Sequence, residues 1–182
     1  MNDLCIDMGW NSLNKYGEQL CGDHVETIEQ EDPSLVFVLA DGLGSGVKAS
    51  ILSTLTAKII STMIAHSMSL EECVSTIAST LPVCQKRGIA YSTFTILRIA
   101  GDREAEIIQY DNPPVIMLRN GENYEYRRDR VEIDGKIIYQ SKIDLTKDDI
   151  FVIMSDGAVY AGVGHALNFG RQRENIIRYI EE

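Results

Sequence analysis

One stretch of the sequence decides the fold: residues 35–46, Leu-Val-Phe-Val-Leu-Ala-Asp-Gly-Leu-Gly-Ser-Gly. Its first six residues are apolar, a length typical of a buried strand. Asp41 and Gly42 end this run, and the glycine lets the backbone turn sharply away. A second, mostly apolar run at residues 150–155 ends in the same way, with Asp156 followed by glycine. The sequence therefore predicts two buried strands that each carry a carboxylate at one end.

Two such strand ends, if they lie side by side, could hold a divalent cation. Mg²⁺ and Mn²⁺ prefer carboxylate and carbonyl oxygens, and a side chain rooted in a strand has little conformational freedom left to lose. The alternatives are less economical. Either two carboxylates are buried without partners, at a cost of several kcal/mol each, or Asp156 merely caps a short helix that starts at Ala158. Asp23, in a Gly-Asp pair of the first loop, is a common turn residue and matters only beside the other two.

Glycine is dense in the turn that follows the first strand end, at three of the five positions 42–46. A strand-to-helix turn capped by Ser45 is one interpretation. Three glycines exceed what such a turn needs, and they suit a backbone that approaches a ligand closely beside a helix start that favours an anion. The spacing differs from both the dinucleotide-binding fingerprint and the phosphate-binding P-loop.

The composition indicates one globular domain and excludes several kinds of partner. The chain has 182 residues, 45% of them hydrophobic, and its 27 acidic and 17 basic residues give a net charge of -10. This charge disfavours binding to nucleic acid or to anionic membranes, whereas cations at an acidic site would attract an anionic substrate locally. Apolar stretches break off well before the ~20 residues of a membrane span, so none is expected.

Cysteine and histidine placement argues against other sites. The four cysteines form no CxxC pair and no secretory leader precedes them, so we expect reduced thiols and a cytoplasmic location, with Cys73 and Cys84 as packing residues. The three histidines lack zinc-ligand spacing, and His66 is expected at a helix end. Ser45 and Ser155 have no nucleophile motif around them, so a side-chain nucleophile is not expected.

Hydrophobic periodicity predicts an α+β fold in which helices pack on antiparallel sheets. Ser69 and Glu72 form the pattern of a capping box, Asn120-Gly121 is typical of a hairpin turn, and residues 122–132 have the charge mixture of a solvated hairpin. The first helix is expected to pack through apolar residues at three-and-four spacing: Ile51, Leu52, Leu55, Ile59, Ile60, Met63 and Ile64. The expected strands are residues 4–14, 24–30, 35–40, 90–99, 104–110, 114–119, 123–127, 136–143 and 150–155, and the expected helices are residues 47–66, 70–81 and 171–182.

These features, in this order, resemble the metal-dependent protein phosphatases of the protein phosphatase 2C type, and more closely the bacterial branch typified by stage II sporulation protein E. The resemblance covers nearly the whole chain, 1–182, as a single domain. It implies a four-layer α-β-β-α sandwich, in which helices flank two antiparallel sheets. The matching elements are Gly22-Asp23, residues 40–46, the two helices, Ser92-Thr93-Phe94, Asn112-Pro113-Pro114 and residues 154–157.

The resemblance also implies a centre of two Mn²⁺ or Mg²⁺ ions. Asp41 would be the bridging carboxylate, Gly42 would offer its backbone carbonyl, Asp156 would bind the second ion, and Asp23 would contact the metals directly or through water. The implied reaction is hydrolysis of phosphoserine or phosphothreonine by a metal-activated water. The implied substrate is a phosphorylated regulatory protein, such as an anti-sigma-factor antagonist. The Asn-Pro-Pro turn is expected to act as scaffolding.

The chain departs from the family pattern after residue 156. The family ends with further helices and a strand that bears one more metal-binding Asp, whereas no Asp follows Asp156 here. We therefore expect that the last helices and strand are missing, and that the chain as given binds metal weakly and has reduced or no activity. Lys15 is a candidate for the family's phosphate-holding arginine. The alternative function is a catalytically silent protein-interaction module.

Overall fold

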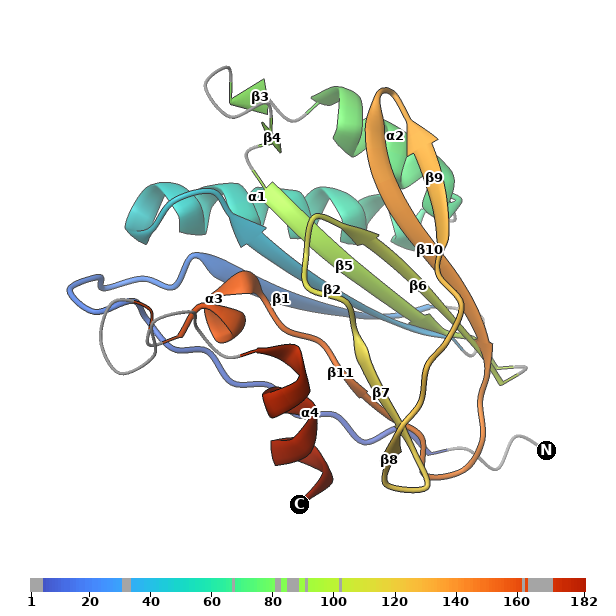
Figure 1. Cartoon of the computed structure of the whole chain (residues 1–182). Helices are drawn as coiled ribbons and strands as arrows, with labels where there is room; N and C mark the ends of the chain where they lie inside the picture. The colour runs from blue at the N-terminus through green and yellow to red at the C-terminus, as the bar shows by residue number, and fades with distance from the viewer. Residues whose placement is uncertain are drawn as a thin grey trace.

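A six-stranded antiparallel sheet forms the centre of the molecule (Figure 1). The computed structural model describes residues 5–30, 34–66, 68–80, 83–84, 89–90, 92–101, 103–161, 163 and 172–182. The strand order is β1-β2-β5-β6-β10-β9, and every neighbouring pair is antiparallel. The strands are β1 (Asp23–Glu29), β2 (Leu35–Gly42), β5 (Ser92–Ile99), β6 (Glu104–Tyr110), β9 (Asp129–Ile133) and β10 (Lys136–Asp144). Two very short strands, β3 (Val83–Cys84) and β4 (Ile89–Ala90), pair separately.

Two helices, α1 (Gly46–Ala65) and α2 (Leu70–Thr80), cover one face of this sheet (Figure 1). Alternate residues of the strands point toward the helices, as the period of two requires. The resulting core combines strand residues with buried residues of both helices. Its members are Val36, Val38, Ala40, Ala57, Ile60, Ile64, Cys73, Val74, Ile77, Phe94, Ile96, Ile108, Tyr110 and Ile138.

The face of α1 that packs on the sheet differs from the predicted one. Ile60 and Ile64 are buried as expected, but Ile51 and Leu55 are 61% and 49% exposed. Small residues take their place at the start of the helix, including Ala49 and other buried residues of α1. Small side chains let a helix axis approach a sheet more closely than isoleucine or leucine would, so the periodicity of the large residues alone gave the wrong face.

A second, smaller sheet packs on the other face of the six-stranded sheet. Its order is β11-β7-β8, and helix α4 contacts it through β8. Buried residues between the two sheets form a second core: Leu97, Ala105, Ile107, Val115, Met117 and Ile143. The elements are β7 (Ile116–Arg119), β8 (Glu122–Asn123), β11 (Ile150–Val152), α3 (Asp156–Val159) and α4 (Arg173–Glu181). The predicted α+β sandwich of two antiparallel sheets with flanking helices is confirmed.

Most predicted elements agree with the structure to within a few residues, and two do not. The predicted strand 4–14 is wrong, because residues 5–14 adopt no regular structure and Met8 and Trp10 are 47% and 66% exposed. The predicted strand 123–127 is also wrong: β8 ends at Asn123, and the chain then crosses to the large sheet as β9. β9 is an edge strand with mostly exposed side chains, so it lacks the alternation that identifies a strand.

Several local predictions are confirmed in detail. The backbone N–H of Ser69 donates to Glu72 Oε2 at 2.9 Å, and the N–H of Glu72 donates to Ser69 Oγ at 3.2 Å, which is the reciprocal capping box. His66 lies at the end of α1, with Nδ1 2.8 Å from the carbonyl oxygen of Thr62. Cys73 is a buried packing residue, and burial raises the pKa of its thiol to about 11. The side chain of Cys84 and all of His165 lie outside the described residues.

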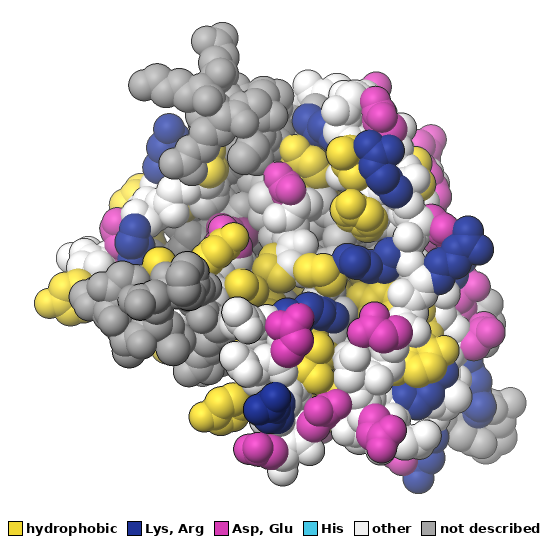
Figure 2. Space-filling model, in the orientation of Figure 1, with side chains coloured by type: hydrophobic (Ala, Val, Ile, Leu, Met, Phe, Trp, Pro, Cys, Tyr) yellow, Lys and Arg dark blue, Asp and Glu magenta, His cyan; other side chains and the backbone are white. Residues whose placement is uncertain are grey.

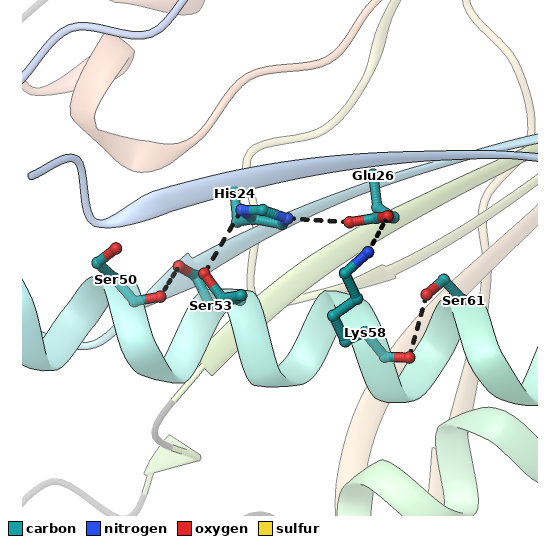
Figure 3. A network of polar contacts seen from close by, with 7 residues as sticks. His24, Glu26, Ser50, Ser53, Lys58 and Ser61 are labelled. Atoms are coloured by element: carbon teal, nitrogen blue, oxygen red, sulfur yellow. Dashed lines mark hydrogen bonds and ion pairs between the residues drawn. The ribbon is translucent and has the colours of Figure 1, made fainter.

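Polar contacts attach α1 to β1, the edge strand beneath it (Figure 3). Glu26 accepts a hydrogen bond from Lys58 of α1, and its other carboxylate oxygen lies 3.0 Å from Nε2 of His24. Burial alone would raise the pKa of Glu26, but the hydrogen bonds from Lys58 and His24 together lower it. The edge strand is thus held to the helix layer by a partly buried ionic contact.

Helix α1 is long and apolar enough to cross a membrane by length and composition alone. In this fold it packs on the sheet through residues such as Ala57, Ile60 and Ile64, so we interpret it as the central helix of the domain. Elsewhere on the surface, acidic and basic side chains are interspersed with exposed hydrophobic ones, as the face in Figure 2 shows.

Candidate metal centre

The register of β1 and β2 brings the first two predicted site residues together. Asp23 on β1 is directly opposite Asp41 on β2. Cross-strand partners point to the same face of a sheet, with Cβ atoms about 5 Å apart. Asp41 has the same parity as Phe37, which packs between the two sheets, so both acids face the smaller sheet.

Asp156 joins them from the smaller sheet. It follows β11 and is the first residue of α3, whose N-cap residue is Ser155. The Asp41 carboxyl group hydrogen-bonds to both Asp23 and Asp156, and Ser155 donates its hydroxyl to Asp23 Oδ2 at 2.7 Å. Three carboxylates separated by up to 133 residues of sequence therefore meet where the two sheets come together. The alternative in which Asp156 caps a helix starting at Ala158 is wrong, since α3 already begins at Asp156.

The electrostatics of this cluster are unfavourable for three negative charges. Burial raises the pKa of Asp41 to about 8, and the neighbouring charges of Asp23 and Asp156 add to the rise. Without a cation, Asp41 is therefore mostly protonated at pH 7 and donates a hydrogen bond to its acidic neighbours. A raised pKa of this kind in a group of acids is typical of functional sites.

Gly42 has a packing role that the sequence did not reveal. A Cβ placed on Gly42 would lie 2.0 Å from the carbonyl oxygen of Ala49 in α1. Its N–H donates to the carbonyl oxygen of Gly22 at 3.1 Å, and a Cβ on Gly22 would lie 3.2 Å from Ala49 Cβ. Glycine is required at position 42 because the helix backbone lies directly against the strand end. The tight contact also fixes the two acids that flank this glycine pair, Asp23 and Asp41.

A polar network beside Asp41 was not predicted as part of the site. Thr93 on β5 is the cross-strand partner of Asp41, and its hydroxyl donates to Asn112 Oδ1 at 2.6 Å. Asn112 in turn donates to Thr95 Oγ1 at 3.1 Å, and Gln109 donates to the carbonyl oxygen of Pro113 at 2.8 Å. The turn after β6 is thereby attached to β5. Threonine at alternate positions of an apolar strand was the one sequence signal for this network.

Two other predicted residues take positions outside the cluster. Ser45 is the N-cap residue of α1 by position, yet it makes no side-chain capping bond within the described residues, and its hydroxyl donates to Glu18 at 2.8 Å. Lys15 is exposed in a turn, where its carbonyl oxygen accepts from the N–H of Glu18. Its predicted role toward phosphate stays a prediction.

The three acids fit a hard divalent cation by their chemistry, since they offer six carboxylate oxygens in mutual contact. Asp41 lies between the other two in this chain of contacts. Among the residues that the structure describes, no three His, Cys, Asp or Glu side chains are already arranged to enclose an ion by themselves. Backbone oxygens, water or further residues would have to complete the coordination.

The fold is shared with phosphatase domains of known structure. The PP2C phosphatase domain of SpoIIE from Bacillus subtilis, solved with a fragment of its regulatory domain, matches with a TM-score of 0.72 and 19% identity over 86% of this chain and 46% of that one. The RsbU and RsbW domains of Rv1364c from Mycobacterium tuberculosis give 0.66 and 17% over 86% and 44%. RsbX in complex with magnesium gives 0.62 and 23% over 94% and 84%.

These likenesses define the class of protein, the PP2C-type phosphatase fold. The chain spans less than half of the first two structures and most of the third. No curated protein matches it in sequence. The family model for stage II sporulation protein E (SpoIIE) matches residues 31–181, and the chain belongs to this family.

Proposed function

We propose that this chain is a protein serine/threonine phosphatase domain whose activity depends on divalent cations. The observation that carries the proposal is the meeting of Asp23, Asp41 and Asp156 at one place between the sheets, with the pKa of Asp41 raised to about 8. A purely structural cluster of three acids would destabilise the fold without compensation. A cation would offset that cost, and the family membership of the chain supports this function.

The proposed ligands are those that the sequence predicted. Asp41 is central and would bridge two ions, Mn²⁺ or Mg²⁺, while Asp23 and Asp156 would each bind from one side. The backbone carbonyl of Gly42 is the fourth proposed ligand. When bound, such ions supply an activated water and offset negative charge on a phosphoryl group.

The protein's own groups would hold this arrangement in place. Asp41 must release its proton before it can act as a ligand, so binding is coupled to proton release. Ser155 keeps Asp23 oriented through its 2.7 Å hydrogen bond, and Ser92 fixes the end of β2 by donating to the carbonyl oxygen of Asp41 at 3.0 Å. Thr93 and Asn112 form an uncharged polar wall on the next strand.

The proposed substrate is a phosphoserine or phosphothreonine on a regulatory protein, such as an anti-sigma-factor antagonist. Its support is the resemblance to the bacterial branch and the membership of the SpoIIE family. The phosphate carries the negative charge that a protein with a net charge of -10 would otherwise repel. Local cations at the acidic cluster would reverse that repulsion.

A second candidate, a catalytically silent interaction module, rests on the absence of any Asp after position 156. The test measures phosphate release from phosphoserine and phosphothreonine peptides with Mn²⁺, using this chain and a version extended by any coding sequence that follows Glu182. We expect weak activity from the chain, more from an extension that carries a further acidic strand, and none from Asp41→Asn or Asp156→Asn. Turnover that survives both substitutions would contradict the phosphatase proposal, and partner binding without turnover in any form would favour the module.

A further inference from the structure

Glu18 stands apart in the N-terminal segment of the described chain. Residues 5–20 run over the surface without helix or strand, and each of them is exposed except Glu18, which is half-buried. The exposed side chains include large apolar ones, such as Trp10 at 66% and Leu13 at 84%. A glutamate that is less exposed than its apolar neighbours has a specific partner.

That partner is the start of helix α1. Ser45, the N-cap residue of α1, donates its hydroxyl to Glu18 Oε1 at 2.8 Å. Glu18 Oε2 lies only 2.2 Å from the position that a Cβ on Gly46 would occupy, and Gly46 has a φ of +67°. Glycine at position 46 is therefore required twice, for the backbone conformation and for the space that the Glu18 carboxylate fills.

The loop that carries Glu18 is itself a defined turn. The N–H of Glu18 donates to the carbonyl oxygen of Lys15 at 2.9 Å, and Gly17 has a φ of +85°, as a type II turn requires of its third residue. A carboxylate at a helix N-terminus also interacts favourably with the helix dipole. The turn thus presents one charged group to the first turn of α1.

The same loop contacts α1 a second time, next to the acidic cluster. Gly22 accepts a hydrogen bond from Gly42 at 3.1 Å and packs against Ala49 of α1. Asp23 follows Gly22 directly, and Asp41 precedes Gly42. The start of α1 therefore lies between the Glu18 contact on one side and the residues that flank the two acids on the other.

We propose that Glu18 is a positioning residue that clamps the first turn of α1 and thereby keeps Gly42 and Asp41 in place for cation binding. The carboxylate acts through Ser45 and Gly46 and is not itself a metal ligand. The inference deepens the proposed function and rests on it for the effect on cation binding. The clamp itself exists in the metal-free protein and can be tested there.

The first arm of the test is amide hydrogen exchange of the metal-free protein. The amides of residues 49–52 are the first that hydrogen-bond within α1, and those of residues 57–60 serve as an internal reference. Glu18→Ala should speed exchange at 49–52 about tenfold relative to the reference, the factor that corresponds to about 1.4 kcal/mol for one charged hydrogen bond. Glu18→Gln keeps an oxygen acceptor and should restore most of the protection. Gln19→Ala, at an exposed neighbouring position, should change nothing.

The second arm is a double-mutant cycle with Ser45→Ala, read out by exchange at residues 49–52 and by Mn²⁺ binding. If the clamp exists, the Glu18→Ala and Ser45→Ala effects on exchange are not additive, because either change breaks the same contact. Mn²⁺ binding should weaken about tenfold in Glu18→Ala and recover in Glu18→Gln. Additive effects, an unchanged exchange rate at 49–52, or an equal increase at 49–52 and 57–60 would overturn the proposal.

The two proposals fail in distinguishable ways. If the unmodified chain does not bind Mn²⁺ at any concentration, the cation site is wrong, while the exchange arm still decides whether the clamp exists. If the chain binds Mn²⁺ and Glu18→Ala binds it equally well, the clamp has no role at the site and the inference is overturned.

Discussion

Asp41 is the residue on which the site depends. Its carboxyl group touches two other acids, and burial together with their charge raises its pKa to about 8. In the unfolded chain an aspartate has a pKa of about 3.9. The native state therefore binds more protons than the unfolded state between these two values, and the stability of the metal-free protein falls as the pH rises from about 4 to about 8.

Asp41→Asn tests this directly. Asparagine cannot ionise and keeps hydrogen-bonding capacity, so the metal-free variant should be at least as stable as the unmodified chain at pH 8 and should lose this part of the pH dependence. Urea unfolding between pH 5 and pH 8.5 measures both. Parallel stability profiles for the two proteins would show that Asp41 is not held among charged neighbours.

Gly42→Ala tests the close approach of α1. The added Cβ would overlap the backbone of Ala49, at 2.0 Å from its oxygen and 2.6 Å from its carbonyl carbon, so the helix start must move. We expect a loss of at least about 1–3 kcal/mol in the free energy of unfolding, together with weaker Mn²⁺ binding.

The matched control is Gly157→Ala, which follows the other strand-end aspartate. Its nearest neighbour would be Ser155 Oγ at an ordinary 3.7 Å, so its stability should change little in the same chemical denaturation experiment. Equal losses in both variants would contradict the packing role of Gly42.

At the scale of elements, a buried ion pair fixes the strand that delivers Asp156. Asp149 precedes β11 and is 3% exposed, and Arg119 at the end of β7 donates to it through Nε at 2.9 Å and Nη2 at 2.8 Å. Thr146 donates to the same carboxylate through its N–H and hydroxyl. Burial alone would raise the pKa of Asp149, but these hydrogen bonds outweigh it and lower the pKa.

Arg119→Ala should destabilise the domain by about 3–5 kcal/mol, because it leaves Asp149 buried without its charged partner. Because the folded pKa of Asp149 is lowered, its contribution is complete above the unfolded pKa of about 3.9 and is lost as the pH falls through the lower folded value. Denaturation midpoints between pH 3 and pH 7 measure this, and the variant should be less sensitive to acid. Arg127→Ala, which breaks an ion pair whose side chains are 87% and 54% exposed, is the control and should cost no more than about 1 kcal/mol. Equal effects of the two substitutions would contradict the structural role of Arg119.

The sequence predicted elements well where one local rule sufficed. The capping box of Ser69 and Glu72 and the buried strand 35–40 followed from short-range patterns. Strand 4–14 was wrong because its apolar residues remain exposed, and the packed face of α1 was wrong because small residues, not large ones, set the helix-sheet distance. The sequence also indicated the three acids, but it could not show that the β1–β2 register pairs Asp23 with Asp41. Glu18 and the network of Thr93 and Asn112 depend on contacts between distant segments, which no local pattern records.

For the whole molecule, the two sheets meet at the acidic cluster, so cation binding should stabilise the entire fold. A ligand that binds only the native state adds about 2.7 kcal/mol at one hundred times its Kd. Mn²⁺ should therefore raise the Tm of the chain, and more so as the pH rises toward 8, because Asp41 must lose its proton first. Thermal unfolding with and without Mn²⁺ at pH 6 and pH 8 measures this, and a shift that is equal or larger at pH 6 would contradict the coupling.

The most direct test of the central claim is a Mn²⁺ titration followed by electron paramagnetic resonance, in which the signal of free Mn²⁺ decreases as the protein binds it. If Asp23, Asp41 and Asp156 form the cation site, the unmodified chain removes free Mn²⁺ from solution, even if weakly, and Asp41→Asn at the same concentration leaves the free signal unchanged. Equal depletion by the two proteins would place the ions elsewhere and would contradict the claim.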